Sequence, residues 1–242
     1  MVLKFFLFFM LFSVLHAKDI SPVFKLQSIG YVSDFVVNKN LLYAANDMGT
    51  IDVFDLKTKK IINQITLPPV TSGRNRLIAA NIMSVDYLNG KVLIVSIGKG
   101  LYRNVWIYEN HELKNIADET KKLTIKEARF LNDGQIIFGT IGSDIILHDT
   151  SEKYNIYNRH VSHSTLGDML LSSDKTEIIT ADESGEVQIL DATNSKVKKR
   201  YSSQNVDNIF HVAYSNSTIL TAGQDRRMAV YQNGIDDYLY TK

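Results

Sequence analysis

The feature that most constrains this chain is an internal repeat. Each copy contains an apolar strand, a polar turn, a second strand that ends in small residues, a turn with Gly or Asp, and a third strand. The third strand ends in an aromatic or aliphatic residue, followed in most copies by Asp. The five third strands are residues 51–55, 105–109, 145–149, 187–191 and 228–232. A period of about 40 residues with several short strands per unit is typical of the blades of a β-propeller.

The second strands support the same register. They are residues 41–45, 91–96, 135–140, 177–181 and 218–223. Alternation at period two and a high content of Val, Ile, Thr and Tyr favour strands over the helices of a solenoid. Asn89-Gly90 and Asp133-Gly134 are hairpin signals, because Gly accepts a positive φ without strain. The first gap between third strands is longer than the others, and the extra residues are an insertion from Pro68 to Asn81.

The first residues predict export. Lys4 precedes a continuous apolar run from Phe5 to Leu15, and Ala17 follows before the charged pair at 18–19. This pattern is typical of a secretory signal peptide, and the run is shorter than the roughly 20 residues of a membrane span. We therefore expect a signal peptide at 1–17, a single mature domain at 18–242, and a periplasmic protein without a membrane anchor after cleavage. The alternative is an uncleaved N-terminal anchor.

Composition excludes several classes of site. The chain has 27 basic and 26 acidic residues, so net charge indicates no nucleic-acid partner. The 242 residues contain no cysteine. Disulfides, thiolate metal sites, a cysteine-linked lipid anchor and covalent haem attachment are therefore excluded.

Three segments carry a resemblance to a known family. Residues 44–55 (AANDMGTIDVFD) follow the order small-small-x-Asp-x-Gly-x-β-x-β-aromatic-Asp, and residues 181–191 and 221–231 are similar to them. This order resembles the core of a WD40 repeat. The resemblance implies an all-β, WD40-like propeller that acts as a non-catalytic, monomeric scaffold for protein partners. No repeat ends in Trp-Asp, and the Gly-His pair that opens many WD40 repeats is missing, which puts the family's buried hydrogen-bond network in doubt.

The number of blades is not settled by the repeats. Five full repeats are visible, and the segments 24–29 and 235–240 both read as additional outer strands. Because five blades with an extra strand at the front do not close neatly, we predict that the chain is part of a seven-bladed ring, as a shortened version of a longer propeller. A five-bladed ring, or an outer strand that pairs elsewhere, is the alternative.

No residue pattern predicts chemistry. His160 and His163 are three residues apart in an expected loop, but no carboxylate partner stands at a recognisable spacing, while His148 and His211 read as structural strand residues. The Gly98–Gly100 turn lacks the Gly-Lys-Ser/Thr context of a phosphate loop. We therefore expect no catalytic, cofactor-binding or metal-binding residue, and no cofactor.

One rim of the propeller is the predicted partner-binding surface. Loops from an outer strand to the next inner strand, and loops from a second to a third strand, lie on the same rim. The residues assigned to it are Arg74, Arg76, Lys99, Tyr102, Arg103, Arg159, Arg226 and Arg227. We expect this rim to be mostly basic, with Arg able to grip carboxylates of a partner. The alternative is that these charges only keep the loops soluble.

The opening of the chain suggests a more specific role. Residues 24–37 and 49–60 resemble the WD-repeat accessory proteins that are encoded with periplasmic nitrate reductase. The resemblance implies assistance in maturation of that enzyme or in electron delivery to it, without a redox centre in this chain. Two alternatives stay open. One is an outer-membrane assembly propeller, which the missing lipid-anchor cysteine argues against. The other is a periplasmic propeller enzyme with an unrecognised metal site.

Overall fold

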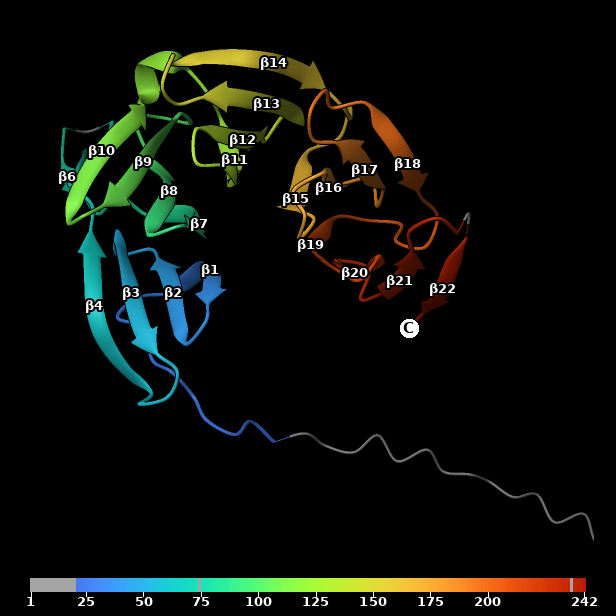
Figure 1. Ribbon diagram of the computed structural model, residues 1–242, viewed down its shortest axis with the longest axis horizontal. Helices are drawn as coiled ribbons and strands as arrows, with labels where there is room; N and C mark the ends of the chain where they lie inside the picture. Colours follow the sequence, from blue (N-terminus) through green and yellow to red (C-terminus); the bar gives the residue numbers. More distant parts are fainter. Residues whose placement is uncertain (1–20, 74, 236) are drawn as a thin grey trace, which may run out of the picture.

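The computed structural model describes residues 21–73, 75–235 and 237–242. They form five four-stranded antiparallel sheets, or blades, which stand side by side around a common centre (Figure 1). The predicted all-β propeller with five repeats is thereby confirmed. The predicted signal peptide, residues 1–17, lies outside the described residues and stays a prediction.

The strands of each blade follow one another along the chain from the centre outward. Blade 1 contains β1 (Val32–Asn38), β2 (Leu41–Asn46), β3 (Thr50–Asp55) and β4 (Lys60–Thr66). Blade 2 contains β7 (Ile82–Leu88), β8 (Lys91–Ile97), β9 (Arg103–Glu109) and β10 (Glu112–Ala117). Blade 3 contains β11 (Ile125–Asn132), β12 (Gln135–Thr140), β13 (Asp144–Asp149) and β14 (Tyr154–His160). Blade 4 contains β15 (Leu166–Leu171), β16 (Glu177–Asp182), β17 (Val187–Asp191) and β18 (Val197–Tyr201). Blade 5 contains β19 (Ile209–Ser215), β20 (Thr218–Gly223), β21 (Met228–Gln232) and β22 (Tyr238–Thr241).

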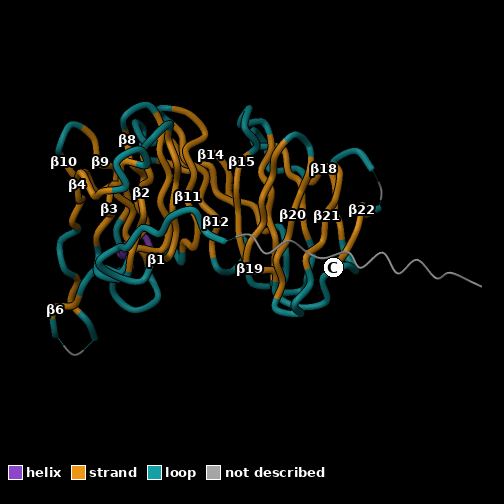
Figure 2. The backbone as a smooth tube through the Cα atoms, turned by 90° about the horizontal axis from the view of Figure 1, so that it is seen from below, coloured by secondary structure: helices purple, strands orange, loops and turns teal. Residues whose placement is uncertain are grey.

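Two connections carry their own structure. Inside the predicted insertion, β5 (Val70–Thr71) and β6 (Leu77–Ile78) form a small hairpin, which protrudes from one rim when the molecule is viewed edge-on (Figure 2). A single turn of 3₁₀-helix, η1 (Glu119–Lys121), joins blade 2 to blade 3. No helix in the described part of the chain is long and apolar enough to cross a membrane.

Four apolar cores hold the blades together, one at each junction between successive blades. Representative buried pairs are Tyr43 with Val85, Leu93 with Ala128, Ile137 with Met169, and Ile179 with Val212. Because each central blade is covered on both faces, its second strand (β8, β12 or β16) has a continuous apolar run instead of strict alternation. The blades trace an arc that is open between the first and the last (Figure 1).

The ends of the chain differ in part from expectation. Residues 24–29 do not form the predicted outer strand. The edge of blade 1 is already occupied by β4, and this segment instead binds Asp52, whose Oδ2 accepts hydrogen bonds from Ser28 Oγ at 2.6 Å and Ile29 N at 3.0 Å. Blade 5 is completed by its own β22, which overlaps the second segment that the sequence predicted as an outer strand, residues 235–240.

Candidate protein-interaction site

A column of polar side chains runs along the inner strands. Each inner strand carries a β-bulge at the same place, and the residue after the bulge is Asp34, Ser84, Glu127, Asp168 or His211 in the five blades. Bulges often re-aim a side chain in this way. The column joins residues about 45 positions apart in sequence, in keeping with the period of a propeller repeat.

Three residues of the column fasten one blade to the next. Asp34 Oδ2 accepts the backbone N–H of Val85 at 2.9 Å, and Ser84 Oγ accepts that of Ala128 at 3.3 Å. The carboxylate of Asp168 accepts the N–H of Val212. These three contacts repeat one geometry across successive blades, so these side chains have a structural role.

Arg129 neutralises the acidic part of the column. Its guanidinium contacts Glu127 at 2.9 Å and Asp34 at 3.3 Å, and it donates to Ser84 Oγ at 2.7 Å. Burial raises the pKa of Glu127 to about 8, with Arg129 opposing the shift and the Asp34 charge adding to it. Burial likewise raises the pKa of Asp34, against the pull of Arg129. Two carboxyl groups thus share one half-buried cation.

The pKa of Asp168 is shifted in the opposite direction to those of Glu127 and Asp34. Burial would raise the pKa of its carboxyl, but the His211 imidazole and the Val212 N–H lower it below the usual value. The His211 ring lies 3.6 Å from this carboxylate, which in turn raises the pKa of the imidazole. Among the described residues, no group of three or more His, Asp or Glu has a metal-binding arrangement.

The predicted rim residues fall into two groups. Arg76, Lys99, Arg226 and Arg227 are exposed on the insertion hairpin, the β8–β9 loop and the β20–β21 turn, and Tyr102 is half-buried in the β8–β9 loop. Lys99 also lines a cavity of about 270 Å³ against Pro68, Trp106 and Glu119. Arg74 lies outside the described residues.

Arg103 and Arg159 are both held by hydrogen bonds, but Arg103 is buried whereas Arg159 is exposed. Arg103 is buried, and its Nη1 donates to the carbonyls of Leu101 at 2.6 Å and Tyr102 at 3.2 Å. Arg159 Nε donates to Ser195 Oγ at 3.0 Å, in the turn between β17 and β18.

The rim is not mostly basic, contrary to the expectation. Asp47 and Glu183 lie in turns between second and third strands, and Asp207 lies in the connection from β18 to β19. These are the same kinds of loop that carry Lys99 and Arg226. The rim therefore presents both signs of charge, because acidic turn residues favour the tight turns that join the strands.

The two ends of the arc expose apolar residues that the repeat elsewhere buries. Phe35 on β1 is 61 % exposed, whereas its counterpart Val85 in blade 2 is 2 % exposed. The corresponding residues of blades 3 to 5 are also buried: Ala128, Met169 and Val212. In each of those blades this position packs against the preceding blade. The face of blade 1 that points away from blade 2 is therefore an apolar surface of the kind that contacts a preceding blade, and it is exposed.

Blade 5 shows the complementary face. Leu220 on β20 is 38 % exposed, whereas its counterpart Leu93 in blade 2 is fully buried against blade 3. Other exposed apolar residues of blades 1 and 5 are Val32, Val37, Phe210, Tyr238, Leu239 and Tyr240. We call the surfaces around Phe35 and Leu220 the end faces. Sequence reasoning did not find them, although a comparison of the five first and second strands would show the shared apolar positions.

Comparison of the chain with protein-family models and with curated proteins gave no match.

Proposed function

We propose that this chain is an exported, non-catalytic propeller scaffold that binds protein partners in the periplasm. The observation that carries the proposal is the exposure of Phe35 and Leu220, at positions that every other blade buries against a neighbour. Apolar faces of this kind, on otherwise well-packed β-sheets, are typical of interaction sites. Export and periplasmic location are supported by the apolar run at residues 5–15.

The end faces also support the proposed seven-bladed ring. Each blade contacts its neighbours through sheet faces that carry an apolar residue at the Phe35 or the Leu220 position. The occupant that fits both end faces is therefore a pair of further blades, contributed by additional chain or by a partner. Closure would bury the sheet faces at both ends of the arc, which is how propellers protect their apolar surfaces.

The proposed partner is the periplasmic nitrate reductase system. The support is the resemblance of residues 24–37 and 49–60 to the accessory protein NapL, which implies maturation of the enzyme or electron delivery as the role. In this proposal the exposed basic residues Arg76, Lys99 and Arg226 contact carboxylates of the partner, while the end faces provide apolar area.

The proposal is tested with the tagged mature chain in periplasmic extract of its own host, with mass spectrometry of the captured proteins. Three variants accompany it: Phe35→Ser with Leu220→Ser for the end faces, Arg76→Glu with Lys99→Glu for the rim, and Lys39→Glu as a control in the β1–β2 turn. Arg103 is left unchanged because it is buried.

The expected result is recovery of nitrate reductase subunits by the unchanged chain and by the Lys39→Glu control, with loss in the end-face variant. Equal recovery by the end-face variant would refute a role for those faces. Recovery of outer-membrane assembly factors in place of nitrate reductase would retain the scaffold and remove the nitrate reductase assignment.

A further inference from the structure

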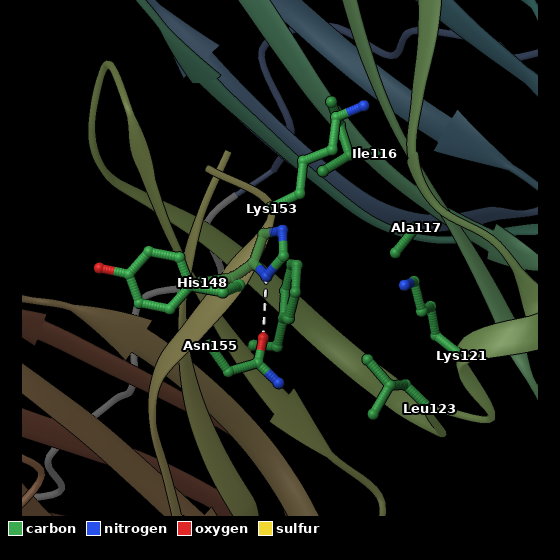
Figure 3. Close-up of a pocket in the computed structure, with 9 residues that line it drawn as sticks. Ile116, Ala117, Lys121, Leu123, His148, Lys153 and Asn155 are labelled. Atoms are coloured by element: carbon green, nitrogen blue, oxygen red, sulfur yellow. Dashed lines mark hydrogen bonds between the residues drawn. The ribbon is translucent and has the colours of Figure 1, made fainter. Parts of the chain in front are cut away.

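A cavity between blades 2 and 3 has the composition of a small-molecule site. It has a volume of about 270 Å³ and lies between the end of β10, the connection through η1, and strands β12 to β14. Ile116, Leu123 and Phe138 supply apolar walls, and Lys121 and Lys153 supply two ammonium groups. Figure 3 shows His148 and Asn155 on one side of the cavity and Lys121 and Leu123 on the other.

The cavity exists where one repeat departs from the others. His148 occupies the position next to the end of β13, and the same position holds Phe54, Tyr108, Leu190 and Tyr231 in the other blades. An imidazole ring is smaller than a phenyl or phenol ring and carries two nitrogen atoms. At this position blade 3 therefore has a more polar side chain than the apolar or phenolic one of the other blades, and a smaller ring than their aromatic residues.

One ring nitrogen of His148 has a hydrogen-bond partner and the other has none among the described residues. Its side chain is stacked on Phe138, with ring centroids 5.5 Å apart, and its Nδ1 contacts Asn155 Oδ1 at 2.8 Å. The residue is only 7 % exposed, and its Nε2 is buried with no hydrogen-bond partner among the described residues. Because Nδ1 donates its proton to the Asn155 oxygen, Nε2 of the neutral ring is an acceptor. A buried acceptor without a partner is unfavourable and rare in folded proteins, so the surroundings of this nitrogen require an explanation.

The two lysines add charge to the same cavity. Neither Lys121 nor Lys153 forms an ion pair within the described part of the chain. Two unpaired ammonium groups beside apolar walls favour an anion that also has an apolar body. Lys121 comes from blade 2's connection and Lys153 from the β13–β14 turn, so a bound anion would bridge the two blades.

We infer that this cavity binds a small organic acid. The ligand class has a compact apolar or aromatic body against Phe138 and Ile116, a carboxylate held by Lys121 and Lys153, and a hydroxyl that donates to His148 Nε2. The cavity is near the lower limit of ligand sites, about 300 Å³, which restricts the ligand to roughly one ring and its substituents. This site is separate from the end faces and does not depend on the proposed scaffold function.

The test uses three probes and calorimetric titration of the mature chain. The probe 4-hydroxybenzoate carries all three features, benzoate lacks the hydroxyl, and 4-hydroxybenzyl alcohol lacks the carboxylate. We expect saturable binding of 4-hydroxybenzoate and affinities about tenfold lower for each of the other two, since each loses one polar contact of about 1–2 kcal/mol.

Variants assign the contacts. His148→Phe restores the aromatic residue of blade 1 and should abolish binding while the unfolding temperature is kept or raised. Lys121→Gln with Lys153→Gln should weaken the acid but leave the alcohol unchanged, and Lys39→Gln is the matched control for loss of a surface charge. Thermal unfolding of each variant shows that the fold is intact.

A second measurement is independent of any variant. In a long-range ¹H–¹⁵N spectrum, the Nε2 resonance of His148 should move on addition of 4-hydroxybenzoate. The inference is overturned if none of the probes saturates up to about 10 mM, or if His148→Phe binds as the unchanged chain does. It is also overturned if the Nε2 resonance stays in place, because a bound water would then be the partner of that nitrogen.

Discussion

The carboxylate of Asp168 accepts the backbone N–H of Val212 at 2.9 Å, and thereby ties the inner strand of blade 4 to that of blade 5. Its other oxygen accepts the N–H of Met169 at 2.7 Å. Replacement by Ala would leave two buried donors without a partner, so we expect Asp168→Ala to lower the free energy of unfolding by about 1–3 kcal/mol. Denaturant unfolding measures the change. Glu183→Gln, in an exposed turn, is the control and should lie within about 0.5 kcal/mol of the unchanged chain.

Glu127 predicts a dependence of stability on pH. Its pKa rises from the usual 4.5 to about 8 on folding, with burial as the main cause. Between these two values the folded state keeps a proton that the unfolded state has lost. The free energy of unfolding therefore falls as the pH rises through this window, by up to about 1.4 kcal/mol per pH unit.

The variant Glu127→Gln should flatten that dependence between about pH 5 and 8, because the titrating group is gone while Arg129 keeps Asp34 as its counter-ion. Urea unfolding at several pH values measures the slope. Glu183→Gln makes the same chemical change at an exposed site and should leave the slope as it is. An unchanged slope in Glu127→Gln would show that Glu127 is ionised throughout this range.

Gly167 lies where blades 4 and 5 approach each other closely. A Cβ at this position in β15 would overlap the carbonyl oxygen of Ile209 in β19, while a Cβ at Gly142 meets no atom within 4 Å. We expect Gly167→Ala to destabilise the protein by about 1–3 kcal/mol or more, since backbone cannot move aside as a flexible side chain can. Gly142→Ala should be nearly neutral. Equal unfolding temperatures for the two variants would contradict the close packing of blades 4 and 5.

Lys99 lies in the β8–β9 loop and Arg103 is the first residue of β9, and substitutions at the two positions should have different effects. Arg103 is buried and donates to two loop carbonyls, whereas Lys99 is exposed. Arg103→Ala should therefore cost about 1–3 kcal/mol of stability, and Lys99→Ala less than about 0.5 kcal/mol. Thermal unfolding distinguishes them. A stable Arg103→Ala variant would return Arg103 to the set of residues available to a partner.

The sequence is sufficient to predict the blades because each repeat carries its own strands and turns. The third strand at 187–191, for example, coincides with β17. The burial of Arg103 could not be predicted in this way, because nothing in the local sequence distinguishes Arg103 from the exposed Lys99. Residues 24–29 have the apolar content of a strand, but Asp52 binds them through long-range contacts that no pattern indicates. The cavity at His148 and the end faces depend on how blades pack, which is set between repeats and not within one.

Phe35 and Val85 give a direct test of whether the arc is open. They are equivalent residues of neighbouring blades, but Phe35 is exposed and Val85 is buried in the core between blades 1 and 2. For the isolated chain, Val85→Ala should lower the free energy of unfolding by about 2 kcal/mol, and Phe35→Ala by no more than about 0.5 kcal/mol. If instead Phe35→Ala costs about 3–5 kcal/mol, as a buried Phe does, the ring closes on itself in solution and the end faces are not available. With a partner bound, the unchanged chain should gain stability according to the partner's concentration, whereas Phe35→Ala should gain less, because it binds that partner more weakly.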